Sequence, residues 1–220
     1  TGGARPLEKT GAGTLILTRA NTYTGGTTIQ GGTLWLLDSA SAGTGAIEMQ
    51  GSTISYGDGI DVANAIVLNS DIAKLDAATG AAATQSGVIS ETGGARPLEK
   101  TGGGMLTLSG ANTYTGETIV QEGTLALSGS LASGVEVQSG TTFGGTGAVT
   151  GNVTNAGTIQ PRLNGSRSTL TIVGNYVGQG GTFASTLGGT SSVIEADQLA
   201  IQGAGNVASG STTIAVSDPT

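Results

Sequence analysis

Four aspartates are the residues of this sequence best placed to do chemistry. Asp58, Asp61, Asp71 and Asp76 form the densest acidic group of the chain. Clustered carboxylates act as general acid and base in enzymes that cleave polysaccharides. A solvated loop surface explains the same group without catalysis, and we favour that interpretation. Because the calcium-loop spacing D-x-[DN]-x-[DN]-G is missing, the sequence predicts no metal site.

Nucleophilic and phosphate-transfer chemistry lacks its usual residues. The chain contains neither histidine nor cysteine, so a Ser-His-Asp triad cannot be assembled. The glycine run Gly102 to Gly104 is followed neither by a helix nor by Lys-Ser/Thr, as a phosphate-binding loop requires. We therefore predict no catalytic residue, no cofactor and no enzymatic activity.

Aromatic residues are the remaining candidates for binding. Trp35, Tyr23 and Tyr114 could form a surface for a host protein or a glycan, and Trp35 is the candidate ligand-binding residue. The competing interpretation places such side chains at the corners of a folded coil. Asn21 and Asn112 are expected to serve turns, where Asn tolerates unusual backbone angles.

An internal repeat contains most of these residues. Leu7–Leu36 recurs as Leu98–Leu127, at an offset of 91 residues, and 26 of 36 positions from Thr1 and Thr92 onward are identical. Leucines two residues apart keep their places while the residues between them change. A strand with one fixed face and one variable face gives this pattern. The pairs Glu8-Lys9 and Glu99-Lys100 are predicted to be exposed and to contribute little to stability.

Composition favours an elongated all-β chain. Glycine accounts for 41 of 220 residues, charged residues for 10% and aromatic residues for 3%, whereas charged residues average about 25% in globular proteins. The net charge of −7 and the lack of a basic cluster exclude nucleic acid as an expected partner. The chain starts in mid-repeat, so we interpret it as a fragment, and the lack of cysteine suits export through a periplasm.

Short strands between glycine turns must stack to bury a face. Strand starts recur after 19 residues, from Leu15 to Leu34 and again in the second copy, which is close to one coil of a parallel β-helix. The sequence predicts about ten coils, stacked at roughly 4.8 Å per coil. An antiparallel β-sandwich is the alternative, but it does not account for a 91-residue repeat. Ile72 to Ala83 is expected to be no more than a turn or a short helix.

The chain changes character near Gly151. Residues 1–150 carry both repeats and are predicted to form the β-helix, whereas residues 151–217 lack the L-E-K-T-G signature. A solenoid needs an atypical terminal segment to cover its last coil. We therefore predict that residues 151–217 form a β-rich C-terminal cap.

Residues 7–36 and 98–127 resemble the passenger-associated transport repeat of bacterial autotransporters. Both copies follow L-x-K-x-G-x-G-x-L-x-L-x-x-x-N-x-Y-x-G-x-T-x-I-x-x-G-x-L, or differ from it at a single position. The tail resembles the end of such passengers in N-A-G-T-I-x-P (Asn155–Pro161), L-T-I-x-G-N-Y (Leu170–Tyr176) and D-x-L-x-I-x-G (Asp197–Gly203). One departure is Pro161-Arg162-Leu163-Asn164, where the family has P-G-N-S.

The resemblance implies a right-handed, single-stranded parallel β-helix of the pectin-lyase-like kind. It implies export to the cell surface, with passage across the outer membrane through the protein's own C-terminal β-barrel, which lies outside this chain. Residues 151–217 would be the autochaperone region that folds first. We expect a monomeric, non-enzymatic stalk of an adhesin or other virulence factor. The alternatives are that the segment itself binds a host protein or glycan, or that it cleaves polysaccharides.

Overall fold

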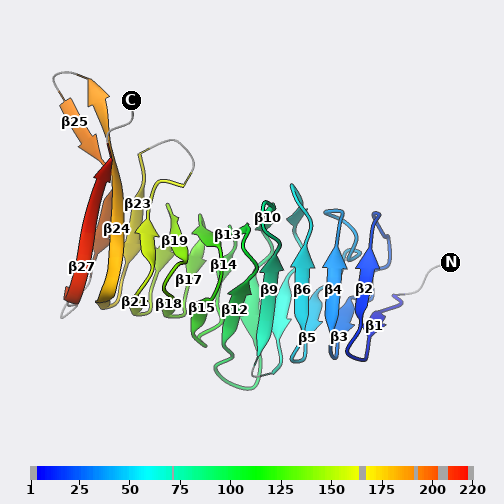
Figure 1. Ribbon diagram of the computed structural model, residues 1–220. Helices are drawn as coiled ribbons and strands as arrows, with labels where there is room; N and C mark the ends of the chain where they lie inside the picture. The colour runs from blue at the N-terminus through cyan, green and yellow to red at the C-terminus, as the bar shows by residue number, and fades with distance from the viewer. Residues whose placement is uncertain (1–3, 71, 164–166, 191–192, 203–207, 218–220) are drawn as a thin grey trace.

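Stacked strands surround a narrow apolar interior in the computed structural model, which describes residues 4–70, 72–163, 167–190, 193–202 and 208–217. All the regular elements among these residues are strands. The strands run across a rod whose N-terminal end lies on one flank of Figure 1 and whose C-terminal end lies on the other. Each turn of the chain contributes up to three strands, so the rod has three sides. No helix in the described part of the chain is long and apolar enough to cross a membrane.

Side one is the first column of parallel strands, and consecutive members are one turn apart. One backbone hydrogen bond continues the column from β11 (Ile89–Glu91) to β14 (Ala111–Asn112), because Thr113 N–H donates to the Ile89 carbonyl at 2.9 Å. The column consists of β1 (Leu7–Lys9), β3 (Thr27–Ile29), β5 (Ile47–Met49), β8 (Ile66–Leu68), β11 (Ile89–Glu91), β14 (Ala111–Asn112), β17 (Ser130–Leu131), β20 (Ala148–Val149), β23 (Thr169–Ile172) and β26 (Gln198–Ile201).

Sides two and three complete each turn. Side two consists of β2 (Thr14–Leu17), β4 (Thr33–Leu36), β6 (Thr53–Tyr56), β9 (Ala73–Ala77), β12 (Leu98–Thr101), β15 (Thr118–Val120), β18 (Val135–Val137) and β21 (Val153–Asn155). Side three consists of β7 (Asp61–Val62), β10 (Ala82–Gln85), β13 (Met105–Leu108), β16 (Thr124–Leu127), β19 (Thr142–Gly145) and β22 (Thr158–Gln160).

The last turns are built differently. The long strands β24 (Tyr176–Thr190) and β27 (Ala208–Ser217) each continue across sides two and three, and they pair in parallel with a register shift between Gln179 and Gly181. β25 (Val193–Ala196) pairs antiparallel with the end of β24 and projects from the rod in Figure 1. The ladder passes from residue 150 to residue 151 without interruption. The proposed boundary at that point stays a prediction about folding units.

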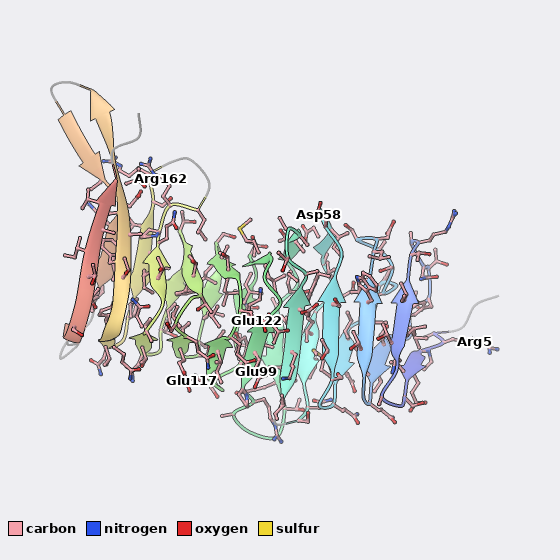
Figure 2. All side chains as sticks on the ribbon, viewed as in Figure 1. Arg5, Asp58, Glu99, Glu117, Glu122 and Arg162 are labelled. Atoms are coloured by element: carbon pink, nitrogen blue, oxygen red, sulfur yellow. The ribbon has the colours of Figure 1, made fainter. Side chains whose placement is uncertain are left out.

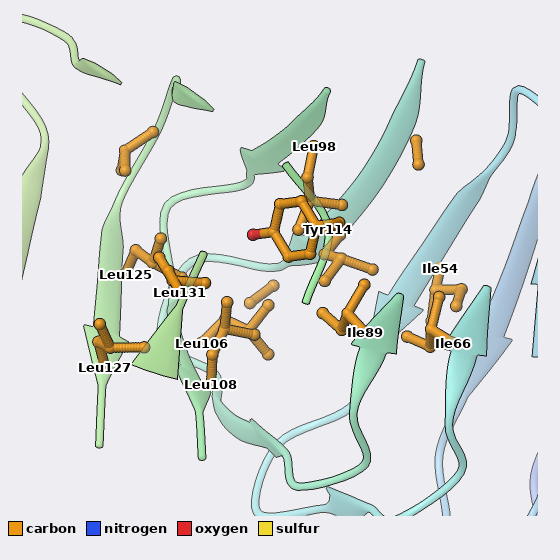
Figure 3. Close-up of a cluster of buried hydrophobic side chains, with 14 of the residues drawn as sticks. Ile54, Ile66, Ile89, Leu98, Leu106, Leu108, Tyr114, Leu125, Leu127 and Leu131 are labelled. Atoms are coloured by element: carbon orange, nitrogen blue, oxygen red, sulfur yellow. The ribbon is translucent and has the colours of Figure 1, made fainter. Parts of the chain in front are cut away.

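The interior is filled by side chains that alternate inward along every strand. Inward positions from all three sides meet in one cluster, which Figure 3 shows for Ile54, Ile89 and Leu106 among others. Because three short strands enclose only a narrow space, aliphatic side chains fill it. These observations confirm the predicted all-β solenoid, which makes about nine turns rather than ten coils.

The segment from Ile72 to Ala83 corrects one prediction. It forms β9 and β10 rather than a turn or short helix. Ala73, Leu75 and Ala77 point inward while Lys74 and Asp76 alternate with them. Three of the alanines in this segment, Ala73, Ala77 and Ala83, are small inward residues that stand in register with larger side chains of the neighbouring strands, whereas Ala78 and Ala82 are exposed.

The two repeats do not occupy the same sides. Starting from Leu7 on side one, the register returns to side one at Ile89 after four turns. Nine further residues carry the chain to Leu98, which pairs with Ala73 on side two. The 91-residue offset therefore equals four turns plus one side. The L-E-K strand lies on side one in the first repeat and on side two in the second.

Candidate functional site

The lysine of each repeat enters the rod instead of pointing to solvent. Lys100 is 1% exposed and stands in register between the inward residues Leu75 and Val120. Lys9 is 7% exposed. The prediction of exposed Glu-Lys pairs is wrong for both lysines, because strand alternation places Leu and Lys of L-E-K on the same inward face. Glu99 pairs instead with Lys74 of the preceding turn, at 2.8 Å.

Three backbone carbonyls surround each ammonium group. Lys100 Nζ donates to the carbonyl oxygens of Thr101 (2.8 Å), Gly102 (2.7 Å) and Glu122 (3.1 Å). Burial lowers the pKa of Lys100 to about 8, while the negative charges of Asp76 and Glu122 act in the opposite direction. The Glu122 carbonyl belongs to the next turn, so this side chain joins two turns of the rod.

Lys9 makes the same set of bonds in the first repeat. Its Nζ donates to the carbonyls of Thr10 (2.9 Å), Gly11 (2.7 Å) and Gly31 (2.9 Å). Gly11 and its counterpart Gly102 have φ angles of 71° and 72°, a left-handed conformation that glycine adopts without strain. The turn can therefore fold back and aim its carbonyl at the ammonium group.

The repeat asparagines also bridge neighbouring turns. Asn112 Nδ2 donates to the Gly110 carbonyl (3.0 Å) and to the Ser130 carbonyl of the next turn (3.2 Å). Its Oδ1 accepts from Ile89 N–H of the preceding turn at 2.8 Å. Asn21 donates in the same way to the Arg19 and Ser41 carbonyls. The predicted turn role is therefore incomplete, since both amides also connect one turn to another.

The repeat tyrosines fill corners of the rod. Tyr114 is fully buried and bonds Thr118 at 2.7 Å, and Thr118 in turn bonds Ser133 at 2.7 Å. Burial raises the pKa of the Tyr114 hydroxyl to about 12. Tyr23 is half-buried and bonds Thr27 at 2.7 Å. Burial therefore removes Tyr114 from the binding surface considered from the sequence, whereas Tyr23 keeps part of its side chain at the surface. We call the Lys, Asn and Tyr of each repeat the fastener residues.

A charged clamp precedes the second repeat. The Glu91 carboxylate accepts from Arg96 N–H (2.6 Å), Thr115 N–H (2.9 Å) and the Thr115 hydroxyl (2.6 Å). Desolvation raises the pKa of Glu91, but these hydrogen bonds outweigh it and hold the pKa below its ordinary value. The clamp joins the connection between β11 and β12, which leads into the second repeat, to the turn that follows. No sequence signal distinguished this glutamate.

The aspartates of the acidic group have different environments and different hydrogen-bond partners. Asp58 accepts Ala82 N–H at 2.9 Å and lies at the edge of the rod in Figure 2. Asp76 accepts from Ser55 (2.7 Å) and Thr101 (3.3 Å). Asp61 is exposed, and Asp71 lies outside the described residues. Within the described ranges, no three His, Cys, Asp or Glu side chains are grouped as metal ligands would be.

A buried carboxylate anchors the C-terminal turns. The Asp197 side chain is fully buried and accepts from Arg162 Nε (3.2 Å), Ser168 N–H (3.1 Å) and Thr186 N–H (2.9 Å). Arg162 lies at the C-terminal end of the rod in Figure 2. We call this cluster the C-terminal latch. The sequence placed Asp197 in a tail motif but gave no sign that the connection between β22 and β23 and the strand β24 both donate to it.

Trp35 lies on the outer face of side two and is 37% exposed. It pairs in register with Ile16, which is 46% exposed, and with Ser55. Its counterpart in the second repeat, Ala126, is only 4% exposed. Ala126 and Leu163 line a cleft of about 190 Å³ beside the segment that follows Pro161. Equivalent outward positions thus differ in how they are covered.

Known proteins share the repeat and are similar to this chain over most of its length. Residues 7–36 and 98–127 match the profile of the passenger-associated-transport-repeat family. The chain is 36% identical over 215 residues to the adhesin BmaC autotransporter of Brucella suis biovar 1, which covers 91% of this chain and 6% of that protein. It is 35% identical over 137 residues to the uncharacterized protein YuaQ of Escherichia coli K12, covering 60% of this chain and 10% of that protein.

A shorter match concerns an extracellular serine protease of Serratia marcescens, with 50% identity over 52 residues, 24% of this chain and 5% of that protein. No solved structure matches the chain. The stacked strands and the two repeats define the class of protein as a β-solenoid built around transport repeats. The similarity over 91% of its length identifies the chain as a segment of an autotransporter passenger. It spans a tenth or less of the curated relatives' lengths.

Proposed function

We propose that this segment is a non-enzymatic stalk of a passenger that is displayed at the cell surface or secreted. The similarity to an autotransporter adhesin supports this location. The absence of histidine from the sequence argues against a serine-protease triad. The fastener side chains form their hydrogen bonds within the chain and connect neighbouring turns, which is what a mechanical stalk needs in order to stay folded. The stalk acts as a monomer and reaches the surface through the outer-membrane β-barrel that the resemblance implies.

We further propose that residues 151–217 promote passenger folding and translocation. The observation that carries this proposal is the direction of the fastener residues. Lys9 and Lys100 each donate to a carbonyl about one turn nearer the C-terminus, as do Asn21 and Asn112. A turn that folds before its C-terminal neighbour leaves buried donors without all their acceptors, which is costly. Folding from the C-terminal end avoids this cost for these four donors, and only Asn112 Oδ1 among the fastener atoms described above then waits for a partner, Ile89 N–H, from the preceding turn.

The C-terminal latch gives such folding a starting point. Asp197, which directly precedes β26, accepts from Arg162 and Ser168 between β22 and β23 and from Thr186 in β24. Breaking a buried ion pair by removing one partner costs about 3–5 kcal/mol. The latch therefore links the last turns through side chains that lie outside both repeats.

Pulsed hydrogen exchange during refolding of the full chain tests the direction. We expect amides of β23 and β26 to gain protection before those of β3 and β5. Asp197→Asn should delay protection throughout the rod, because the latch forms first. Asp58→Asn is the matched control, since it also alters a carboxylate that accepts a backbone N–H but lies far from the latch. Earlier protection of β3 and β5 would overturn the proposal.

A second candidate function is adhesion by the segment itself. The apolar side chains of Ile16 and Trp35 favour it, since they remain exposed on a regular sheet face. Loss of cell adhesion after Trp35→Ala, with the stalk still folded and displayed, would distinguish this candidate from a purely mechanical stalk. Release of products from pectin-like or glycosaminoglycan substrates, which we do not expect, would instead support the polysaccharide-cleaving alternative.

A further inference from the structure

The outer face of side two carries two parallel rows of side chains, with one member per turn. The outer row consists of Ile16, Trp35, Ser55, Asp76 and Thr101, which follow one another in register. The neighbouring row consists of Thr14, Thr33, Thr53, Lys74 and Glu99. Successive members are roughly 4.8 Å apart, the spacing of neighbouring strands. The face is therefore flat and has a regular repeat along the rod axis.

Trp35 supplies an aromatic platform on this face. It is the only tryptophan of the chain, and it is 37% exposed beside Ile16. Aromatic side chains dominate the energetics of recognition because they combine large apolar faces with a polar edge. The apolar C–H face of a pyranose ring is a suitable partner for such a platform. The hydroxyls of Thr33 and Ser55 lie on the same sheet face, on the same turn and the next one.

Asp76 supplies a fixed acceptor two turns from Trp35, at roughly 10 Å. Ser55 donates to its Oδ2 at 2.7 Å and Thr101 to its Oδ1 at 3.3 Å. A carboxylate offers about four acceptor sites, so these two bonds fix the group and leave sites for ligand hydroxyls. Lys74 and Glu99 neutralise each other at 2.8 Å. The two rows thus keep one net negative charge, that of Asp76, and Glu136 adds another further along the same side, so acidic glycans are disfavoured.

We propose that this face binds a neutral oligosaccharide, extended along the rod axis. One sugar ring stacks on Trp35, and a hydroxyl of a sugar further along donates to Asp76. The inference rests on the second candidate function and is independent of the folding role of residues 151–217. The second repeat has Thr107 and Ala126 where the first has Ile16 and Trp35, and Ala126 is covered. The site is therefore confined to the N-terminal turns.

An array of immobilised oligosaccharides, neutral and acidic, tests the proposal with the full chain. We expect the chain to bind neutral glycans in preference to uronic-acid and sulfated ones. Free oligosaccharide of the bound type should then shift Trp35 fluorescence, with saturation. Preference for acidic glycans, or no bound neutral glycan, would overturn the proposal. An unchanged array signal after Trp35→Ala would overturn it as well.

Variants locate the site. Trp35→Ala should weaken binding at least tenfold and Trp35→Phe by less, because Phe keeps an aromatic face. Asp76→Asn should weaken it severalfold. Val88→Ala is the matched control, since Val88 is 40% exposed but lies outside both rows, and it should bind normally. Thermal unfolding of each variant separates lost binding from lost structure. If binding fails while the order of exchange protection holds, only adhesion is rejected.

Discussion

The two transport repeats place nearly the same residues on different sides of the rod. The strand that begins with Leu7 belongs to side one, whereas the strand that begins with Leu98 belongs to side two. The lysine bonds are nevertheless preserved, down to the spacing of donor and acceptor along the chain. The asparagine bond to the next turn is also kept, but it spans 20 residues in the first repeat and 18 in the second. The repeat therefore specifies a local arrangement of strands and turns, and no particular side of the rod.

Outward positions follow a different rule. Ile16 and Trp35 of the first repeat correspond to Thr107 and Ala126 of the second. Inward and fastener positions are constrained by the narrow interior, where a change of volume or a lost bond is costly. Outward positions are free to acquire a ligand surface or to be covered by another part of the chain. Inward and fastener residues thus hold the rod together, whereas outward residues form the surface that it presents to other molecules.

Cysteine cross-linking gives an all-or-none test of whether the L-E-K strand of the second repeat lies on side two. Lys74 and Glu99 are in register on adjacent turns, and strands roughly 4.8 Å apart place their Cα atoms within disulfide range. The chain has no cysteine of its own. We therefore expect Lys74→Cys with Glu99→Cys to form a disulfide under mild oxidation, detected by its changed mobility without reductant.

The control pair distinguishes the two arrangements. Ser90 and Glu99 lie on sides one and two of the same turn. We therefore expect Ser90→Cys with Glu99→Cys to stay reduced. A disulfide between positions 90 and 99 but not between 74 and 99 would contradict the placement of the second repeat on side two.

The buried lysines should give the next largest effect. Lys100→Ala leaves three carbonyls without their donor and opens space in the interior, so it should lower the free energy of unfolding by about 3 kcal/mol. Lys9→Ala should cost slightly less, because Lys9 makes the same three bonds but is 7% exposed against 1% for Lys100. Urea unfolding followed by circular dichroism measures both.

Lys74→Ala is the control for the lysine series. Its side chain is 41% exposed in the ion pair with Glu99, so the expected loss is under about 1 kcal/mol. Equal losses at positions 74 and 100 would mean that the carbonyl cage contributes little to stability. In that case the preserved fastener bonds of the two repeats would be without energetic consequence.

The tyrosine hydroxyls should give a smaller difference between the repeats. Tyr114→Phe removes a buried partner of Thr118, with an expected cost of about 1.5 kcal/mol. Tyr23→Phe removes the equivalent bond at a half-buried corner, where water replaces the hydroxyl, so about 0.5 kcal/mol is expected. Thermal unfolding of the two variants compares them, and a larger loss at Tyr23 would contradict the burial argument.

Sequence periodicity was sufficient for the solenoid because strand alternation and glycine turns are local signals. The same alternation places Lys100 on the inward face with Leu98, against the general preference of lysine for the surface. The two repeats lie on different sides because the 91-residue offset is not a whole number of turns. This depends on turn lengths such as the long one from Ile66 to Ile89, which no local pattern in the sequence indicates. The C-terminal latch joins Arg162 and Asp197 across 35 residues, and no local pattern reports such a contact.

Lys100 should also give the rod a small pH dependence. Burial places its pKa near 8 in the folded chain against an ordinary value of 10.5. Between these values the unfolded chain holds a proton that the folded chain has released, so stability rises with pH in that window. We expect a gain on the order of 1 kcal/mol from pH 8 to 9.5, measured by urea unfolding.

Lys100→Met should remove this gain, whereas Lys74→Met should preserve it. The chain has three lysines, so ¹³Cε labelling can follow the titration of Lys100 directly. Stability that does not change between pH 8 and 9.5, together with a Lys100 pKa near 10.5, would show that the three carbonyls stabilise the ammonium group as much as burial penalises it. The fastener would then be a charged bond at all physiological pH values, and the cost of burying it would be fully offset by its acceptors.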